Sequence, residues 1–469
     1  MGAYSAPMDL DVYIHGVHAM SLEADPQEPP RLRPGPSMAG VSVGWTGAED
    51  IHAAQRWLRL CLPENGALDA YVERAANLLL AHRINAVPRL PETVLWGNAD
   101  SEYSGAVSMS SDGAPPLAST PVPLSQYPSV SDADMGVLLA NAVHEARAGS
   151  NRGYGVTAHR ARASLSGQRP KISLSTSGDG AWCLGEPGCL NTWIVKVEDS
   201  PGLPGEAGVE SVCQAAIGLV GVRAARTSAR VLGGYQCVVS ERSDRVAGAD
   251  GCILPVHQEE LRQAAGWGGG KYPTGIASEP RWKTVYQILR QHAATPDEAC
   301  DEFTRLLACT WLLGHADLHF GNLGFIHEEG RVRLAPAYDV SSSVGTRYDK
   351  TLVLGVGGQR HPHKIGPAQW RAHARSCDLD TERVLGVVSE TINALPDAFA
   401  QARILGKSND EYRVARHVDS RCEKVARHIR LRREHFARGM ARQGASRQSD
   451  ADAACDGRSK GNEDAGPPL

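Results

Sequence analysis

The sequence has few aromatic residues and no long apolar run. Phe, Trp and Tyr make up 6% of its 469 residues, whereas Gly and Pro number 49 and 28. No stretch approaches the roughly 20 apolar residues that a membrane-spanning helix needs, so we expect none. No Lys or Arg precedes Arg31, which argues against a secretory signal peptide. These absences predict a soluble, cytoplasmic protein with many loops.

Closely spaced cysteine pairs and a net positive charge are also lacking. None of the 11 cysteines forms a Cys-x-x-Cys pair. With no secretory segment expected, they are interpreted as reduced thiols and not as a disulfide framework. The formal net charge of −4 does not favour a nucleic-acid-binding protein as a whole.

The length and the order of predicted elements indicate several domains. A chain of 469 residues is too long for one ordinary core. Hydrophobic periodicity predicts a strand at 10–14, helices at 67–82 and 132–148, a strand at 105–109, and helices at 282–292, 298–313, 381–394 and 412–442. We therefore predict a small α/β domain at 1–150, a strand-rich segment at 151–248, a helical segment at 249–444 and a disordered tail at 445–469.

The most informative motif is the stretch from Gly314 to Asn322. Asp317 is followed by Asn322, with four residues between them. This is the spacing of a kinase catalytic loop, in which the aspartate accepts the proton of the attacking hydroxyl and the asparagine holds Mg²⁺. His319 is interpreted as a residue that braces this loop by hydrogen bonding.

A predicted hairpin follows the loop and returns the chain to it. Residues 323–326 and 331–334 are typical of short strands around the turn 327–330. Such a hairpin would bring Asp339 beside Asn322 as the second Mg²⁺ ligand. The arrangement predicts phosphoryl transfer from ATP on an α+β, two-lobed, protein-kinase-like fold.

Upstream residues supply candidates for nucleotide contacts. The polar turn that contains Ser166, Gly167 and Lys171 leads into a strand, and its backbone N–H groups could cradle phosphates. Lys196 lies on an apolar, β-branched strand, where a kinase places the lysine that pairs with the phosphates. Glu210 begins a helical run fourteen residues later and is a candidate partner for Lys196. Each has a simpler alternative. The turn could be an ordinary hairpin turn, Lys196 could be a solvent-exposed lysine, and Glu210 could be an acid favoured in the first turn of a helix.

These segments together resemble the HipA-type toxin kinases of bacterial toxin–antitoxin systems. The resemblance extends over roughly 150–345 and is fainter toward the N-terminus. The segments that carry it are Ser164-Leu165-Ser166-Gly167 with Pro170-Lys171, Trp193-Ile194-Val195-Lys196, Val239-Ser240-Glu241-Arg242-Ser243-Asp244-Arg245, His257-Gln258-Glu259-Glu260, Asp317-x-His319-x-x-Asn322 and Leu334-Ala335-Pro336-Ala337-Tyr338-Asp339.

The resemblance implies a role for each matched residue. It implies Asp317 as catalytic base, Asn322 and Asp339 as Mg²⁺ ligands and Lys196 as a phosphate contact. It also implies that Glu241 lies at the adenine hinge, Asp244 lies near the ribose and Ser164 is an autophosphorylation site. The family usually has a lysine just before the asparagine, whereas this chain has Gly321.

Other functions remain open at this point. The loop also suits small-molecule kinases of the aminoglycoside or choline phosphotransferase type, and a degenerate kinase could act as a binding or regulatory module. A zinc site at His315, Asp317 and His319 is a weaker hypothesis, since no third His or Cys lies at ligand spacing.

The last part of the chain is basic and raises the question of partners. Between Arg413 and Arg447 the sequence is rich in arginine and has apolar residues at helical spacing. A packed, solvated helix is the first interpretation, and contact with DNA or RNA is the second. The resemblance implies a protein substrate of the translation machinery and a helix-turn-helix antitoxin partner that would bring the kinase to DNA.

Overall fold

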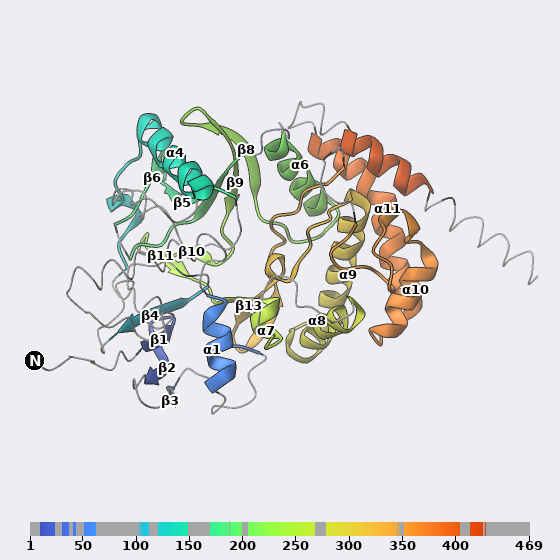
Figure 1. Cartoon of the computed structure of the whole chain (residues 1–469), viewed down its shortest axis with the longest axis horizontal. Helices are drawn as coiled ribbons and strands as arrows, with labels where there is room; N and C mark the ends of the chain where they lie inside the picture. Colours follow the sequence, from blue (N-terminus) through green and yellow to red (C-terminus); the bar gives the residue numbers. More distant parts are fainter. Residues whose placement is uncertain are drawn as a thin grey trace, which may run out of the picture.

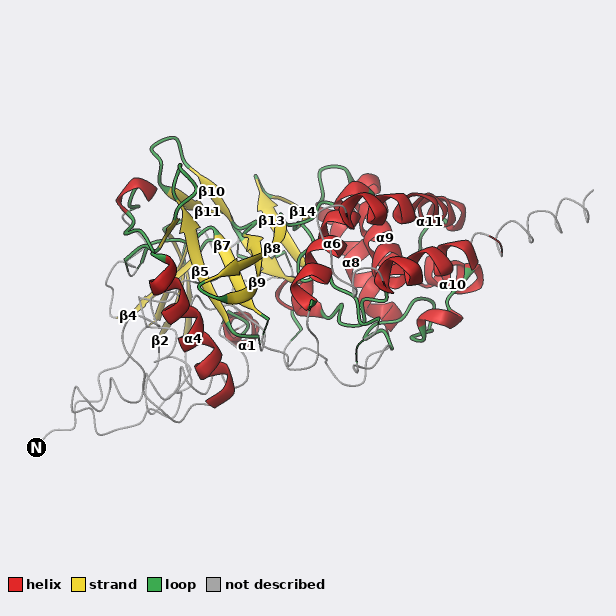
Figure 2. Ribbon diagram, turned by 90° about the horizontal axis from the view of Figure 1, so that it is seen from above, coloured by secondary structure: helices red, strands yellow, loops and turns green. Residues whose placement is uncertain are grey.

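The computed structural model describes residues 10–23, 31–36, 41–43, 51–61, 103, 105–111, 121–148, 169–186, 188–198, 205–267, 278–344, 346, 351–403, 413–424 and 427. Strands gather at one end of the molecule and helices at the other (Figures 1 and 2). The fold is therefore a mixture of sheet and helix, with the sheets earlier in the sequence. The helix predicted at 67–82 lies outside the described residues.

The N-terminal sheet is antiparallel and has the strand order β3-β2-β1-β4. Its strands are β1 (Leu10–Ile14), β2 (Val17–Glu23), β3 (Arg31–Pro34) and β4 (Val107–Ser111), and helix α1 (Ile51–Arg59) packs on it. The strand predicted at 10–14 is confirmed. The strand predicted at 105–109 begins two residues later, because Gly105 and Ala106 form the turn before it.

A second antiparallel sheet has five strands in the order β6-β5-β7-β9-β8. These are β5 (Lys171–Thr176), β6 (Trp182–Cys183), β7 (Trp193–Val197), β8 (Thr227–Leu232) and β9 (Tyr235–Glu241). Helix α4 (Asp132–Ala148) covers one face, and its range is the predicted one. The Ser131 hydroxyl accepts a hydrogen bond from Asp134 N at 3.1 Å, which makes Ser131 the N-cap.

Helix α6 (Glu206–Leu219) packs against strands β8 and β9 of the same sheet. The Glu198 carboxylate at the end of β7 accepts hydrogen bonds from Gly205 N at 2.8 Å and Ala207 N at 3.0 Å. This side chain satisfies two of the N–H groups that a helix start leaves unpaired. The orientation of α6 is thereby fixed relative to β7.

Two small sheets connect the strand-rich part to the helices. One pairs β10 (Arg245–Ala247) with β11 (Ile253–Pro255), and the other has the order β12-β13-β14. The latter contains β12 (Gln258–Glu260), β13 (Gly324–Glu328) and β14 (Arg331–Leu334), with helix α7 (Leu261–Ala264) directly after β12. The predicted hairpin at 323–334 is confirmed, with its turn at Glu329 and Gly330.

The helical part contains the largest core of the described chain. Its main helices are α8 (Ser278–His292), α9 (Pro296–Leu313), α10 (Pro367–Ser376) and α11 (Thr381–Arg403). Trp282, Trp311 and Trp370 are almost fully buried there. The helix predicted to end at 394 continues through Pro396, because Leu395, Phe399 and Ala402 keep its apolar face in the core.

Among the described residues, none of the helices has both the length and the apolar character needed to cross a bilayer. Residues 413–424 are helical, as predicted for the start of the 412–442 segment. The arginines at 432 and 433 lie outside the described residues. So do the predicted domain boundaries at 150 and 444, whereas the boundary at 248 falls in the turn between β10 and β11.

Burial of His373 predicts a pH-dependent stability. Its ring contacts Tyr286 and Trp370 in the helical core, and burial lowers its pKa to about 4. The folded protein keeps His373 neutral, whereas the unfolded chain takes up a proton below a pKa of about 6.5. Stability from this residue is thus complete above pH about 6.5 and falls by up to about 3 kcal/mol as the pH approaches 4.

Urea unfolding between pH 4 and 7 should show this slope. We expect His373→Gln to have a flatter pH dependence than the wild type. His363→Gln, at an exposed position, is the matched control and should keep the wild-type slope. Equal slopes for His373→Gln and the wild type would contradict the assignment.

Candidate active site

The loop from Gly314 to Asn322 begins where α9 ends. Gly314 has a φ of 70°, the left-handed conformation that closes many helices. The Asp317 side chain is 62% exposed. Its backbone oxygen accepts hydrogen bonds from His319 N at 2.8 Å and from Asn322 Nδ2 at 3.0 Å. The loop thus presents the Asp317 carboxylate to solvent while its backbone is tied down.

His319 and Asn322 hold the short helix η4 (Phe320–Asn322) in place. Nδ1 of the buried His319 ring accepts a hydrogen bond from Gly321 N at 3.1 Å. Its remaining nitrogen, Nε2, therefore carries the proton and lies 4.0 Å from Asp317 Oδ2. Because the Asn322 amide nitrogen bonds to Asp317 O, the amide oxygen is the atom that could ligate a metal.

Asp339 lies beyond the β13–β14 hairpin in an unusual backbone conformation. Its φ is 61°, and aspartate is among the few residues that tolerate this region. The preceding residue, Tyr338, donates a hydrogen bond to Gly321 O at 2.8 Å. Ala337 O accepts from Gln214 Nε2 on α6 at 2.8 Å. The segment before Asp339 is thus bound to both the catalytic loop and α6.

Lys196 joins three elements that are distant in the sequence. Its ammonium lies 3.1 Å from Glu210 Oε1 on α6 and 2.5 Å from Asp339 Oδ1. The apolar neighbours of Lys196 on β7, Val195 and Val197, face the core under α4, so alternation directs Lys196 to the opposite face. The predicted pairing of Lys196 with Glu210 is present in the structure.

The charges in this cluster support one another. Burial alone would lower the pKa of Lys196, but Asp339 and Glu210 outweigh burial and raise it. Burial would raise the pKa of Asp339, but the charges of Lys196, Arg169 and Lys171 hold it well below its usual range. Both groups are therefore ionised near neutral pH.

Arg169 is a further member of this cluster, from the segment directly before β5. Its guanidinium donates to Glu210 Oε2 at 3.0 Å and also pairs with Glu206. Lys171 begins β5 and lies opposite Lys196 in the antiparallel register. Three cations therefore approach the two carboxylates Glu210 and Asp339. Ser164, Ser166 and Gly167 lie outside the described residues.

His315 is buried beside the same cluster. Its Nδ1 accepts a hydrogen bond from Ser341 N at 3.3 Å, and its Nε2 has no hydrogen-bond partner among the described residues. Burial lowers the pKa of His315, which the carboxylates of Asp317, Asp339 and Glu210 only partly offset. The zinc hypothesis gains nothing here, because Nδ1 of both His315 and His319 accepts a backbone N–H, which leaves the proton on Nε2, the nitrogen that would have to bind the metal.

Glu241 occupies the position predicted for a nucleotide hinge. It ends β9 opposite Trp193, and its carboxylate pairs with Arg226 at 2.9 Å. The Arg226 guanidinium lies 4.9 Å from the centre of the Trp193 ring. The side chain of Glu241 is thus used at the sheet surface, and the N–H groups of Glu241 and Arg242 donate to Arg226 O at 2.9 Å and Thr192 O at 2.8 Å.

Asp244 is not part of the charged cluster. Its buried carboxylate accepts hydrogen bonds from Arg242 at 2.8 and 2.9 Å and from Gly105 N at 2.8 Å, and it lies 3.1 Å from Arg245. The two arginines hold the pKa of Asp244 well below its usual range, although burial opposes this. Asp244 therefore joins the hinge segment to the N-terminal sheet, a geometry that gives no support to a ribose contact.

Gly105 is required at this junction. Its φ is 70°, and a Cβ there would lie 2.6 Å from Gln258 O. Any side chain would thus clash with the backbone of β12 and strain the turn. The sequence pattern places Gly105 in a strand and does not predict this contact, because its partners lie far along the chain.

We predict that Asp244→Asn destabilises the protein more than it weakens nucleotide binding. The change leaves two buried guanidinium groups without their carboxylate, which typically costs about 3–5 kcal/mol. Urea unfolding of the variant measures this loss. Asp250→Asn, an exposed aspartate in the nearby β10–β11 turn, is the matched control. Wild-type stability together with weakened ATP binding would restore the ribose interpretation.

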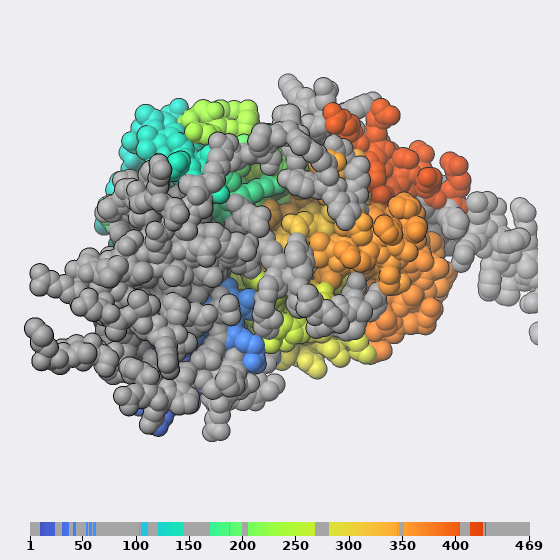
Figure 3. Space-filling model, in the orientation of Figure 1, coloured from blue at the N-terminus to red at the C-terminus, as the bar shows by residue number. Residues whose placement is uncertain are grey.

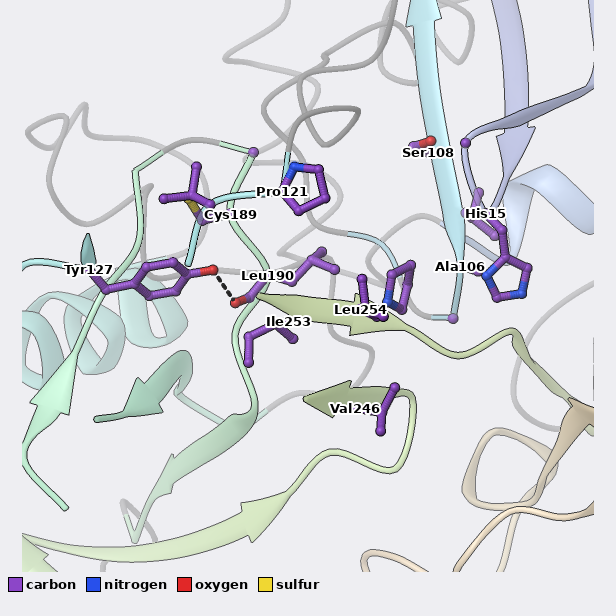
Figure 4. A pocket seen from close by; sticks show the side chains of 16 residues that line it. His15, Ala106, Ser108, Pro121, Tyr127, Cys189, Leu190, Val246, Ile253 and Leu254 are labelled. Carbon is purple, nitrogen blue, oxygen red and sulfur yellow. Dashed lines mark hydrogen bonds between the residues drawn. The ribbon is translucent and has the colours of Figure 1, made fainter. Parts of the chain in front are cut away.

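A separate cavity of about 400 Å³ lies between the N-terminal sheet and the β10–β11 hairpin (Figure 4). Tyr127 donates a hydrogen bond to Leu190 O at 2.9 Å on one side, and His15 lies on the other. The described residues that line it include no Lys, Arg, Asp or Glu. Because phosphates need cations or grouped N–H donors, the charged cluster and not this cavity is the candidate nucleotide site.

Comparisons with known proteins identify the family of this chain. Residues 163–399 match the family described as HipA-like C-terminal domain. The curated protein "Putative kinase Y4mE" of Sinorhizobium fredii (strain NBRC 101917 / NGR234) is 25% identical over 380 residues, covering 80% of this chain and 86% of that protein.

Two solved structures are also similar. A chain of the Shewanella oneidensis MR-1 toxin–antitoxin complex of HipA, HipB and operator DNA aligns with a TM-score of 0.69 at 17% identity, covering 88% of this chain and 97% of that chain. At this identity the likeness shows a shared fold. The Helicobacter pylori proinflammatory kinase CtkA aligns over 57% of this chain with a TM-score of 0.35, too low to support an argument.

Proposed function

This chain belongs to the family of HipA-type kinases, and on that premise we propose that it is an ATP- and Mg²⁺-dependent serine/threonine protein kinase. The observation that carries the proposal is the meeting of Lys196, Glu210 and Asp339. These residues come from a strand, a helix and a loop, and the catalytic loop lies beside them. A strand-rich lobe and a helical lobe that meet at such a cluster are the arrangement that phosphoryl transfer uses.

Each residue in the cluster has a role in the proposed reaction. Asp317 would accept the proton from the substrate hydroxyl, because its carboxylate is exposed on an otherwise fixed loop. Lys196, held by Glu210, would contact the nucleotide phosphates, and Lys171 lies on the neighbouring strand. Glu241 ends the strand whose backbone would contact adenine. His319 would orient the loop through Gly321 N.

The residues present fit a magnesium ion. Mg²⁺ prefers oxygen ligands and usually combines one or two carboxylates with substrate phosphates and water. Asp339 supplies a half-exposed carboxylate, and Asn322 supplies an amide oxygen on the adjacent loop. When bound, Mg²⁺ would neutralise negative charge that develops on the transferred phosphate.

Incubation with ATP and Mg²⁺, followed by phosphopeptide mapping of the enzyme and of a cell lysate, tests the proposal. We expect phosphate on protein and, in the enzyme itself, on Ser164. A phosphoserine there would add nearly two negative charges near the phosphate-binding turn. If ATP is consumed only when an aminoglycoside or a small amino alcohol is present, the small-molecule kinase hypothesis is favoured. No ATP consumption under any condition would favour a binding module.

An antitoxin partner is a further part of the proposal. The Shewanella HipA structure is described as a complex with HipB and operator DNA. By analogy we propose a helix-turn-helix partner for this chain and, through it, contact with DNA. DNA binding by the complex should weaken steeply as salt rises. Loss of that binding in Arg432→Ala plus Arg433→Ala would assign part of it to the basic C-terminal segment.

A further inference from the structure

Gly321 is a glycine for a reason of space and not of backbone conformation. It is absent from the described glycines that have a positive φ. A Cβ built on it would lie 3.2 Å from His319 Cε1 and 3.3 Å from an Arg262 guanidinium nitrogen. Contacts this short require Arg262 or His319 to give by a few tenths of an ångström. A side chain at 321 would therefore press on both residues.

Arg262 is held in that place by helix α7. Its side chain is 2% exposed, and it donates to Glu260 Oε2 at 3.1 Å from Nε and at 2.5 Å from Nη2. The helix is itself attached to the loop, because Leu261 N donates to Leu323 O at 2.8 Å. In Figure 3 the described surface of α1 adjoins the yellow-green segment that contains α7. The Arg262 side chain is thus held in one position beside the catalytic loop.

The backbone of Gly321 connects the two halves of the proposed site. Its N–H donates to His319 Nδ1 at 3.1 Å, on the side of Asp317. Its carbonyl accepts from Tyr338 at 2.8 Å, directly before Asp339. A displacement of this one residue would therefore shift both the catalytic loop and the segment that carries the metal ligand.

We propose that Arg262 and Gly321 act together to position the active-site loop. Because residue 321 has no side chain, the Arg262 guanidinium fits beside the loop and holds it in place. This pairing explains why this chain lacks the lysine expected before Asn322. A lysine at 321 would compete with Arg262 for the same space and for the same carboxylate, Glu260. The inference rests on the proposed kinase function for its kinetic consequence.

A double-mutant cycle tests the pairing. We expect Gly321→Lys alone to lower kcat by about tenfold, because its Cβ already displaces Arg262 or His319 by a few tenths of an ångström, and a misplacement of about 1 Å costs about 10²-fold. Arg262→Gln, which can still donate to Glu260 but leaves space beside the loop, should lower kcat about tenfold by the same argument. The combination should recover to within about threefold of the wild type, because the lysine ammonium then replaces the guanidinium beside Glu260.

Controls separate positioning from general damage. Gly386→Lys is the matched variant, since Gly386 lies on α11 with nothing within 4 Å of its Cβ position. It should keep the wild-type kcat. The KM for ATP of the cycle variants should change little, and kcat is measured below the thermal midpoint of each variant, because changes at these buried positions lower it. A double variant at least as poor as the product of the single effects would overturn the pairing, as would full activity of Gly321→Lys.

A second measurement does not depend on activity. The hydrogen bond from Gly321 N fixes the His319 tautomer with its proton on Nε2. Imidazole ¹⁵N NMR should show this tautomer in the wild type, its loss in Gly321→Lys and its return in the double variant. If the wild type transfers no phosphate, the kinase proposal fails, but the tautomer measurement still tests whether Arg262 and Gly321 act together. An unchanged tautomer in Gly321→Lys would overturn the pairing.

Discussion

Asp317→Asn should lower kcat for phosphoryl transfer by about 10²–10⁴-fold, the usual contribution of a positioned general base. Asparagine cannot accept the substrate proton. The hydrogen bonds by which residue 317 orders the loop, from His319 N and Asn322 Nδ2, end on its backbone oxygen, which the substitution keeps. The side chain is 62% exposed. We therefore expect nucleotide affinity and folding stability to stay near their wild-type values.

The measurement is single-turnover transfer of phosphate from ATP, together with nucleotide binding by calorimetry. Asp397→Asn changes an exposed aspartate on α11, far from the loop, and is the control for removing one negative charge. Transfer by Asp317→Asn at the wild-type rate would show that the base is another group. A loss of both binding and stability would instead mean that Asp317 has a structural role.

The loop half of the candidate site could be predicted largely because its parts are local. The hydrogen bonds that order Asp317, His319 and Asn322 span five residues or fewer. The hairpin that returns the chain to Asp339 is equally short-range. Lys196 could be identified because a lysine among β-branched residues is unusual, and Glu210 because it lies on the next helix. The predicted helix start at Glu210 is wrong, since α6 begins at Glu206. Sequence spacing records such short-range geometry directly.

Contacts between distant segments could not be predicted in the same way. Asp244 was assigned to a ribose, yet its partner Gly105 lies 139 residues earlier. Strand β12 escaped prediction because three residues show no periodicity, and it forms only by pairing with β13. The role of Gly321 was equally hidden, since Arg262 approaches it from another element. In each case tertiary packing decides the outcome, and the local residue pattern is compatible with several answers.

The second large effect is expected from Asp339→Asn. Asparagine has nearly the same shape and tolerates the left-handed φ of 61° at this position, so the backbone should be preserved. The change removes the carboxylate that we propose as a Mg²⁺ ligand, while Lys196 keeps Glu210 as its partner. A metal contributes several kcal/mol to the transition state, and each 1.36 kcal/mol is tenfold in rate, so we expect kcat to fall about 10²–10³-fold.

Turnover measured against Mg²⁺ concentration distinguishes metal binding from a loss of structure. Asp339→Asn should need a higher Mg²⁺ concentration for half-maximal rate, whereas the variant Asp317→Asn should not. Asp378→Asn is a closely matched control, because Asp378 also has a positive φ, of 56°, and pairs with a lysine, Lys283, at 2.7 Å. If both aspartate-to-asparagine changes alter turnover equally, the effect comes from backbone strain. If only Asp339→Asn loses activity and its Mg²⁺ dependence is unchanged, the carboxylate acts through Lys196 and not through a metal.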